Sequence, residues 1–282
     1  MLERVAFEAI VRNALLEDVG RGGDITSDAI VPATIQTTAR IVARRGGVVA
    51  GLEVASLAFL LLDESIEVTV ECCDGNRVEG DTCIAQIAGN ARAILAAERT
   101  ALNFLAHLSG VATATHALIE RIAGTHAHVA DTRKTTPGLR ALEKYAVRCG
   151  GGDNHRYGLD DAVLIKDNHL ALAGSIRAAV AAVRARIGHM VKVEVEVDTL
   201  DQLAEALAEP IDAVLLDNMT PDQLARAVEI IGGRVVAEAS GGITPETIVP
   251  IARSGVDVIS VGWLTHSAPA LDVGLDICAL QR

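Results

Sequence analysis

Aromatic residues are scarce in this chain: they make up only 2% of the 282 residues, although 50% of the residues are hydrophobic. A core of this composition has to be packed from alanine, valine, leucine and isoleucine. Long apolar runs are also missing, because the most apolar stretch, residues 54–62, falls well short of the roughly 20 residues that a helix needs to cross a bilayer. We therefore expect a soluble protein with a large aliphatic core and no membrane span.

Positive charge is scarce as well. The formal net charge of −12 argues against a surface for nucleic acids or anionic membranes. The five cysteines form no C-x-x-C pair, and their odd number favours reduced thiols over a disulfide framework. The N-terminus alternates charged with apolar residues and lacks the apolar run of a secretory signal. A cytoplasmic location follows as the expectation.

Several common motifs are missing too. No G-x-G-x-x-G follows a strand, and the Walker motif G-x-x-x-x-G-K-[ST] and the G-x-S-x-G elbow do not occur. This disfavours dinucleotide binding, P-loop chemistry and the common serine hydrolases. His126 and His128 lie two residues apart without an evident third ligand, so we expect no zinc site there.

What the chain does have is a regular alternation of apolar strands and helix-like segments. Such alternation predicts parallel strands joined by right-handed crossovers, and aliphatic content throughout a strand indicates that both its faces are covered. The six predicted strands are residues 128–132, 162–168, 191–197, 211–218, 234–240 and 256–262. The helix-like segments between them include residues 173–187, 199–208, 221–231 and 245–254. The pattern predicts a parallel α/β barrel.

The first hundred residues have a different pattern. Residues 38–45 and 66–72 alternate as antiparallel strands do, and residues 93–108 have helical spacing. We predict an N-terminal α+β sandwich domain over residues 1–111 and the barrel domain over 112–266. The tail, 267–282, is expected to pack back on the first domain, with an apolar helix at 271–280.

Each predicted barrel strand ends in polar residues, and in such barrels the chemistry lies at the C-terminal ends of the strands. Arg133, Lys134, Arg156 and Lys166, with His155 nearby, gather cations at one barrel mouth. Crowded like charges are costly unless a multiply anionic ligand balances them. The alternative is an internal salt-bridge network with the aspartates at 131, 153 and 167.

Glu196 and Asp217 end adjacent predicted strands, and Glu194 shares a face with Glu196. Carboxylates there suit Mg²⁺, a sugar hydroxyl or a cationic transition state; the alternative is pairing with Lys192 or Lys166. Glycine turns at 240–242 and 261–262 are typical of phosphate-binding loops in late barrel positions, although a plain strand–helix connection has the same appearance.

With these residues in view, the sequence resembles the quinolinate phosphoribosyltransferases, also called nicotinate-nucleotide pyrophosphorylases (carboxylating). The resemblance runs nearly from end to end and is most specific between residues 131 and 169. The matching stretches are E-D at 17–18, G-D-I-T-S at 23–27, E-R-T-A-L-N at 98–103, S-G at 109–110, D-T-R-K-T-T-P-G at 131–138, 150–158, L-I-K-D-N-H at 164–169, E-V-E at 194–196, L-D-N at 216–218, E-A-S-G-G-I at 238–243 and V-G at 261–262.

The resemblance implies an open, mostly parallel α/β barrel with an N-terminal α+β sandwich domain. It implies a Mg²⁺-dependent pentosyltransferase of NAD biosynthesis that converts quinolinate and 5-phosphoribosyl 1-pyrophosphate to nicotinate mononucleotide, pyrophosphate and CO₂. It also implies a homodimer, or a higher oligomer, with shared active sites. The sequence departs from the family at Trp263, where a small residue is usual.

The resemblance also implies roles for individual residues. Lys134, Lys166, Glu196 and Asp217 would be catalytic, and Glu196 and Asp217 would hold Mg²⁺, directly or through water. Arg99 would reach the partner subunit's site. The implied substrate contacts are Arg99, Thr132, Arg133, Lys134, His155, Arg156, Lys166, Glu196 and Asp217, with Ser240, Gly241, Gly242, Val261, Gly262 and Trp263 in the phosphate loops.

Three other functions remain open at this point. A Schiff-base aldolase would use Lys166 as its nucleophile, but would leave the arginines unexplained. A relative with this fold could act on another base, such as nicotinate, or be a paralogue from a molybdenum operon. A non-enzymatic scaffold would bind phosphorylated ligands without releasing pyrophosphate.

Overall fold

Contacts between residues divide the chain into two units in the computed structural model, which describes residues 3–278. The first unit runs to His116 and adds Thr136–Gly151 and the segment from Thr265; the second comprises Ala117–Thr135 and Gly152–Leu264. Residues 136–151, which the sequence placed in the barrel domain, have their contacts in the first unit. The reason is apolar burial, because Leu142 and Ala146 are fully buried in that unit's core.

The first unit is built on an antiparallel sheet with the strand order β12-β1-β5-β3. Its strands are β1 (Gln36–Ala43), β3 (Glu67–Val70), β5 (Cys83–Asn90) and β12 (Val273–Ile277), with a separate pair β2 (Gly47–Val48) and β4 (Arg77–Val78). Its helices are η1 (Arg4–Ala6), α1 (Glu8–Val19), α2 (Ile25–Ile30), α3 (Leu52–Leu62), α4 (Ala91–Arg121, which runs on into the second unit) and α5 (Arg140–Cys149). The predicted α+β domain is confirmed.

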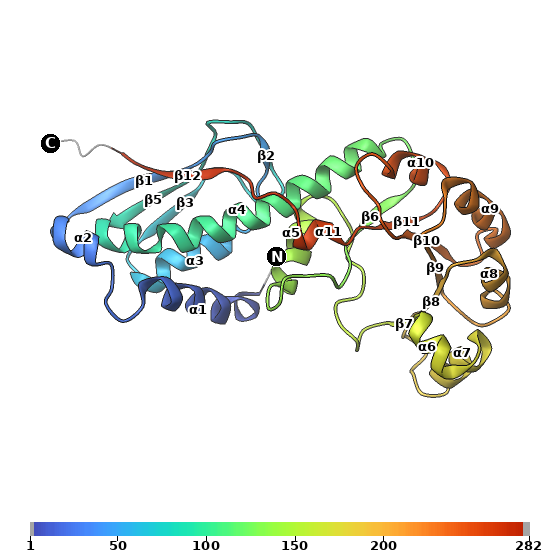
Figure 1. Cartoon of the computed structure of the whole chain (residues 1–282). Coiled ribbons are helices and arrows are strands. Elements are labelled where there is room, and N and C mark those ends of the chain that lie inside the picture. The colour runs from blue at the N-terminus through green and yellow to red at the C-terminus, as the bar shows by residue number, and fades with distance from the viewer. Residues whose placement is uncertain (1–2, 279–282) are drawn as a thin grey trace. The chain divides into compact units, whose positions relative to one another are not determined.

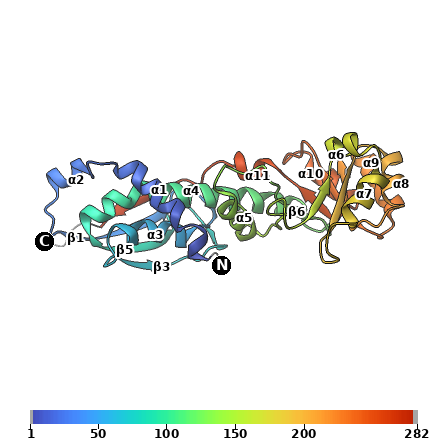
Figure 2. The same cartoon turned by 90° about the horizontal axis from the view of Figure 1, so that it is seen from below.

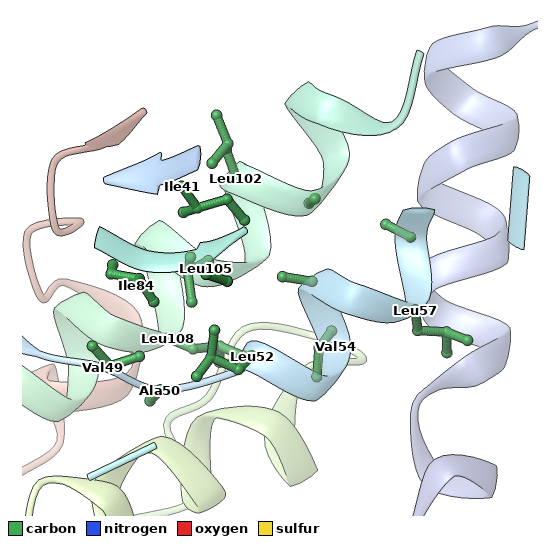
Figure 3. Close-up of a cluster of buried hydrophobic side chains, with 14 of the residues drawn as sticks. Ile41, Val49, Ala50, Leu52, Val54, Leu57, Ile84, Leu102, Leu105 and Leu108 are labelled. Carbon is green, nitrogen blue, oxygen red and sulfur yellow. The ribbon is translucent and has the colours of Figure 1, made fainter. Parts of the chain in front are cut away.

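Figure 3 shows aliphatic side chains in the core of this unit, to which the buried Phe7 and Phe59 add two aromatic rings. Leu102, Leu105 and Leu108 recur at three-residue spacing on α4, and their side chains are at most 3% exposed. They meet Ile41 of β1 and Ile84 of β5. The leucines that recur with helical spacing on α4 and the isoleucines on one face of the sheet therefore form one core.

The tail of the chain corrects one expectation. Residues 273–277 form strand β12, antiparallel to β1 with Ala39 opposite Ile277, and the helix predicted for 271–280 is wrong over the residues described; residues 279–282 lie outside the described residues. Val273, Leu275 and Ile277 alternate with Gly274 and Asp276, which is the period of a strand. The tail does pack on the first unit, as the sequence predicts.

The second unit contains six parallel strands in the order β6-β11-β10-β9-β8-β7. They are β6 (His128–Ala130), β7 (Val163–Ile165), β8 (Val193–Val197), β9 (Ala213–Asp217), β10 (Val236–Ser240) and β11 (Val258–Ser260). Within residues 3–278 no ladder joins β6 to β7, so the barrel is open. All six predicted strands are confirmed, each shorter at its ends than its apolar run.

Helices connect these strands and lie outside their arc, as Figures 1 and 2 show. They are α6 (Asp167–Ala173), α7 (Ile176–Arg184), α8 (Leu200–Ala206), α9 (Pro221–Ile231) and α10 (Ile248–Arg253). A short helix, α11 (Trp263–His266), follows the last barrel strand, β11. The start of α9 illustrates why they form where they do: Thr220 and Gln223 make a capping box around Pro221. No helix of the described chain has the length and apolar character needed to span a membrane.

Candidate active site

The carboxyl ends of the barrel strands surround a cavity of about 510 Å³. Parallel strands end at the same edge, so the polar residues that stop each apolar run converge there. The cavity is lined by Thr132, Arg133, Lys134, His155, Arg156, Leu164, Lys166, Glu196, Leu215, Asp217, Asn218, Glu238, Ser240, Gly241, Gly242 and Ser260. All of these residues belong to the second unit.

Two arginines give one part of the cavity its positive charge. The buried Nε of Arg133 has no hydrogen-bond partner among the described residues. Arg156 donates through one guanidinium nitrogen to the Ala162 carbonyl, at 3.1 Å. Burial, and then the charge of Arg133, lower the pKa of Arg156. An unused buried donor on Arg133, beside a second partly buried guanidinium, indicates a site built for an anion.

Two carboxylates oppose these cations. Lys166 Nζ lies 2.6 Å from Glu196 Oε2, so the ion pair left as an alternative for Glu196 is present. Burial, and then the nearby Asp198, raise the pKa of Asp217, whose carboxylate accepts a 2.6 Å hydrogen bond from the Asn218 amide. A carboxylate whose surroundings disfavour its charge gains from a bound cation. Hard oxygen donors of this kind fit Mg²⁺.

His155, Glu194 and Glu238 form a cluster at the cavity wall: the two glutamates are buried, His155 is partly buried, and His155 and Glu238 line the cavity. His155 Nε2 is 3.0 Å from Glu194 Oε2 and 3.6 Å from Glu238 Oε1. The backbone N–H of Arg156 donates to His155 Nδ1 at 2.8 Å. Since Nδ1 accepts, we assign the proton to Nε2, which donates to Glu194. The histidine therefore links the backbone of Arg156 to the buried acids.

Glu238 is the acid that sequence reasoning did not single out. It is 5% exposed, and burial, followed by the charge of Glu194, raises its pKa to about 7. Its position in the sequence could have identified it as a cavity residue, because it lies two residues before Ser240 and therefore on the same face of β10. Two adjacent buried negative charges are costly, and this cost is the physical reason for the raised pKa of Glu238.

Asn218 and Gly241 shape the loop after β10. A Cβ atom on Gly241 would lie 2.2 Å from Asn218 Oδ1, and Gly241 and Gly242 have φ angles of +94° and +57°. Asn218 itself has a φ of +53° and donates its backbone N–H to the Ser240 carbonyl at 2.9 Å. Only glycine fits position 241, where the backbone can approach a ligand closely.

Most of the residues singled out from the sequence line this cavity, and two groups do not. Val261, Gly262 and Trp263 follow β11 and are not part of the lining, although a Cβ atom on Gly262 would lie 2.8 Å from Lys134 Cδ. Arg99 is exposed on α4 of the first unit, where it lines a separate hollow of about 340 Å³ with Glu17 and Asp18.

Comparison with known proteins decides the family. The model of the quinolinate phosphoribosyl transferase C-terminal domain matches residues 111–276, and that of the N-terminal domain matches residues 24–109. The chain belongs to the quinolinate phosphoribosyltransferase family. The nicotinate-nucleotide pyrophosphorylase [carboxylating] of Mycobacterium leprae is 46% identical, covering 98% of this chain and all of the relative. The probable enzyme of Bacillus subtilis is 41% identical over 98% of this chain and 95% of its own length.

Solved structures agree with this family. The nicotinate-nucleotide pyrophosphorylase from Francisella tularensis superposes with a TM-score of 0.95 at 42% identity, covering 99% of this chain and 98% of that one. The human nicotinic acid phosphoribosyltransferase, at 14% identity and a TM-score of 0.64, shares the fold. The open parallel barrel with a small α+β unit is therefore the fold of this family.

Proposed function

We propose that this chain transfers the phosphoribosyl group of 5-phosphoribosyl 1-pyrophosphate to the ring nitrogen of quinolinate. The products are nicotinate mononucleotide, pyrophosphate and CO₂, and the reaction belongs to NAD biosynthesis. The observation that carries the proposal is one cavity in which Arg133, Arg156 and Lys166 face Glu196 and Asp217 beside a glycine loop. The activity is also the one named for relatives at 41% and 46% identity.

Quinolinate is a planar dianion, and the two arginines match it. The unpartnered Nε of Arg133 and the partly buried guanidinium of Arg156 supply donor forks for two ring carboxylates. His155 fixes the backbone of Arg156 through its Nδ1. The ring would then lie above the buried acids, with its nitrogen toward the sugar site.

The second substrate carries a phosphate at one end and a pyrophosphate at the other. The backbone of Ser240, Gly241 and Gly242 lines the cavity and suits the 5′-phosphate, because a glycine turn presents N–H groups to an anion. We assign the pyrophosphate to Lys134 and Lys166, which line the same cavity. Thr132 supports Lys134, since its Oγ1 accepts from the Lys134 backbone N–H at 3.0 Å.

Glu196 and Asp217 act on the bond that breaks. As pyrophosphate leaves C1′, the ribose gains oxocarbenium character, and fixed carboxylates stabilise the developing positive charge. These two residues would hold Mg²⁺, directly or through water; when bound, the ion supplies charge neutralisation for the pyrophosphate. The ring nitrogen forms the new bond to C1′, and the electron pair of the old C1′–O bond leaves with the pyrophosphate.

Loss of CO₂ follows from the charge on the new pyridinium ring. The electron pair of the C2–carboxylate bond stays on C2, where the adjacent cationic nitrogen stabilises it, and a proton then adds to C2. The protein's part in this step is to orient the ring and to exclude water.

We further propose a homodimer in which Arg99 completes the partner's site, and a cytoplasmic location. Arg99 is an exposed cation on a helix whose neighbouring leucines are buried, which suits a contact outside its own unit. All five cysteines are free thiols, which suits a reducing compartment. A Schiff-base aldolase is disfavoured, since Lys166 Nζ is engaged by Glu196 and such an enzyme would leave the two arginines of the cavity unexplained.

The test is an assay for nicotinate mononucleotide with quinolinate and 5-phosphoribosyl 1-pyrophosphate in the presence of Mg²⁺. Nicotinate, which lacks one carboxylate, is the control substrate. Two charge-assisted hydrogen bonds lost from one carboxylate should lower kcat/KM by roughly a hundredfold or more. Comparable kcat/KM values for the two acids would overturn the substrate assignment.

A further inference from the structure

Trp263 is the single tryptophan of the chain. It begins α11, directly after the Val261-Gly262 turn that ends the last barrel strand. Its side chain is half-buried, and its indole Nε1 donates to the backbone carbonyl of Ile243 at 2.9 Å. One hydrogen bond therefore joins the loop after β11 to the loop after β10.

The loop after β10 is the one that this hydrogen bond restrains. In the loop after β10, Gly241 and Gly242 have φ angles in the left-handed region, and a chain with glycine there has many other conformations open to it. Ile243 follows these two glycines and is 4% exposed, so its carbonyl has a fixed place from which to accept the indole N–H. The bond anchors the loop at the point where the backbone returns to ordinary angles.

The loop after β11 is packed closely against neighbouring residues. A Cβ atom on Gly262 would lie 2.8 Å from Lys134 Cδ and 3.5 Å from Thr132 Oγ1, so this backbone passes directly over the Thr132–Lys134 turn. The backbone N–H of Val261 also donates to the Ala130 carbonyl at 2.9 Å. Trp263 thus connects a backbone packed on Lys134 to Ile243, the residue that follows Gly241 and Gly242.

We propose that Trp263 is a positioning residue for the phosphate end of the site: its indole ties the glycine loop at 240–242 to the packed backbone at Gly262, so that the loop keeps the conformation that binds a 5′-phosphate. The inference rests on the proposed function. Ordering a loop on binding costs conformational entropy, and a loop already fixed by a hydrogen bond loses less. The residue does not line the cavity, so it acts through the loops and not by contact.

The first test is Trp263→Phe, which keeps an aromatic ring and removes the N–H. We expect KM for 5-phosphoribosyl 1-pyrophosphate to rise roughly three- to tenfold, the range of one hydrogen bond, while kcat and KM for quinolinate stay within about twofold. The matched control is Tyr145→Phe, which removes a 2.8 Å hydrogen bond to Asp74 in the other unit. It should leave all three constants unchanged. An unchanged KM in Trp263→Phe, or a fall in kcat alone, would overturn the inference.

The second test uses the unmodified protein, so it does not depend on how the variant folds. Because the chain has one tryptophan, its fluorescence reports on this position alone. We expect ribose 5-phosphate to change the emission in a saturable way and pyrophosphate to leave it unchanged. A response to pyrophosphate only, or to neither, would contradict the assignment. If the unmodified protein formed no nicotinate mononucleotide, the proposed function would fail, whereas normal turnover with a silent tryptophan would remove this inference alone.

Discussion

Glu196 and Asp217 end neighbouring strands, and their carboxylates should matter most when C1′ becomes cationic. We predict that Glu196→Gln and Asp217→Asn each lower kcat by roughly 10²–10³-fold and change KM for quinolinate by much less. Steady-state kinetics at saturating Mg²⁺ measure both constants. The matched control is Asp212→Asn, which removes ion pairs to Lys192 and Arg184 away from the cavity. If the double variant kept near-normal turnover, the two carboxylates would be structural.

Glu238 should make the stability of the fold depend on pH. Its pKa of about 7 in the folded chain lies above the ordinary value of 4.5, so the stability it contributes is present below about pH 4.5 and is lost as the pH rises through 7. Glu238→Gln mimics the protonated acid at every pH. We predict that its Tm exceeds that of the unmodified protein by a few degrees at pH 8, with a smaller difference at pH 5.

Thermal melts at the two pH values measure this effect. Glu246→Gln is the control, because a hydrogen bond to Thr244 lowers the pKa of that exposed carboxyl. This variant should therefore show no increase in Tm at pH 8. An equal Tm difference at pH 5 and pH 8 for Glu238→Gln would mean that Glu238 is not protonated in the fold.

The residues of the cavity differ in how well they can be predicted from the sequence. Lys166, Glu196 and Asp217 were predictable, because each is a charge that interrupts an apolar strand at its end. Glu238 was harder to recognise, since a carboxylate inside a strand is explained only by His155, which a distant loop brings within 3.6 Å. Asn218 was missed because its role depends on a positive φ angle and on the contact with Gly241, neither of which leaves a pattern in the sequence.

At the scale of elements, the spacing of apolar residues along the chain decides which helices and strands can be predicted. The six barrel strands are continuous apolar runs between helices, and all six were found. Strand β5 was not predicted because Gln86, Gly89 and Asn90 break its apolar run. The apolar residues of β12 predict a helix when the segment is read alone. The segment forms a strand because it pairs with the edge of β1, a partner that local sequence does not reveal. The boundary at residue 136 depends on where α5 buries its apolar face, which local sequence does not specify.

The glycine loop after β10 provides the prediction at this scale. Gly241→Ala would place a methyl group 2.2 Å from Asn218 Oδ1 at a φ of +94°, so the loop has to move. We expect KM for 5-phosphoribosyl 1-pyrophosphate to rise roughly tenfold or more. Gly233→Ala is the matched control: its φ is +71°, but no atom lies within 4 Å of the new Cβ. It should cost about 1 kcal/mol of stability and leave KM unchanged. Equal effects of the two variants on KM would rule out a special role for the loop.

At the scale of the whole molecule, the proposed dimer makes a prediction about shared sites. Arg99→Ala should abolish activity and leave the dimer intact, and so should Lys134→Ala. Mixing the two variants under subunit exchange should restore roughly a quarter of the wild-type sites, because half the dimers are mixed and each has one intact site. Activity of the mixture is measured against each variant alone. No recovery, with exchange confirmed independently, would place Arg99 outside the partner's site.

The central claim is that one cavity couples phosphoribosyl transfer to loss of the 2-carboxylate, and carbon labelling tests it most directly. Quinolinate labelled in the 2-carboxylate is turned over with 5-phosphoribosyl 1-pyrophosphate, and the amounts of labelled CO₂, pyrophosphate and nicotinate mononucleotide are compared. The account predicts equal amounts of all three, and no labelled CO₂ when the label is in the 3-carboxylate. Pyrophosphate release without CO₂, or CO₂ from the 3-carboxylate, would contradict it.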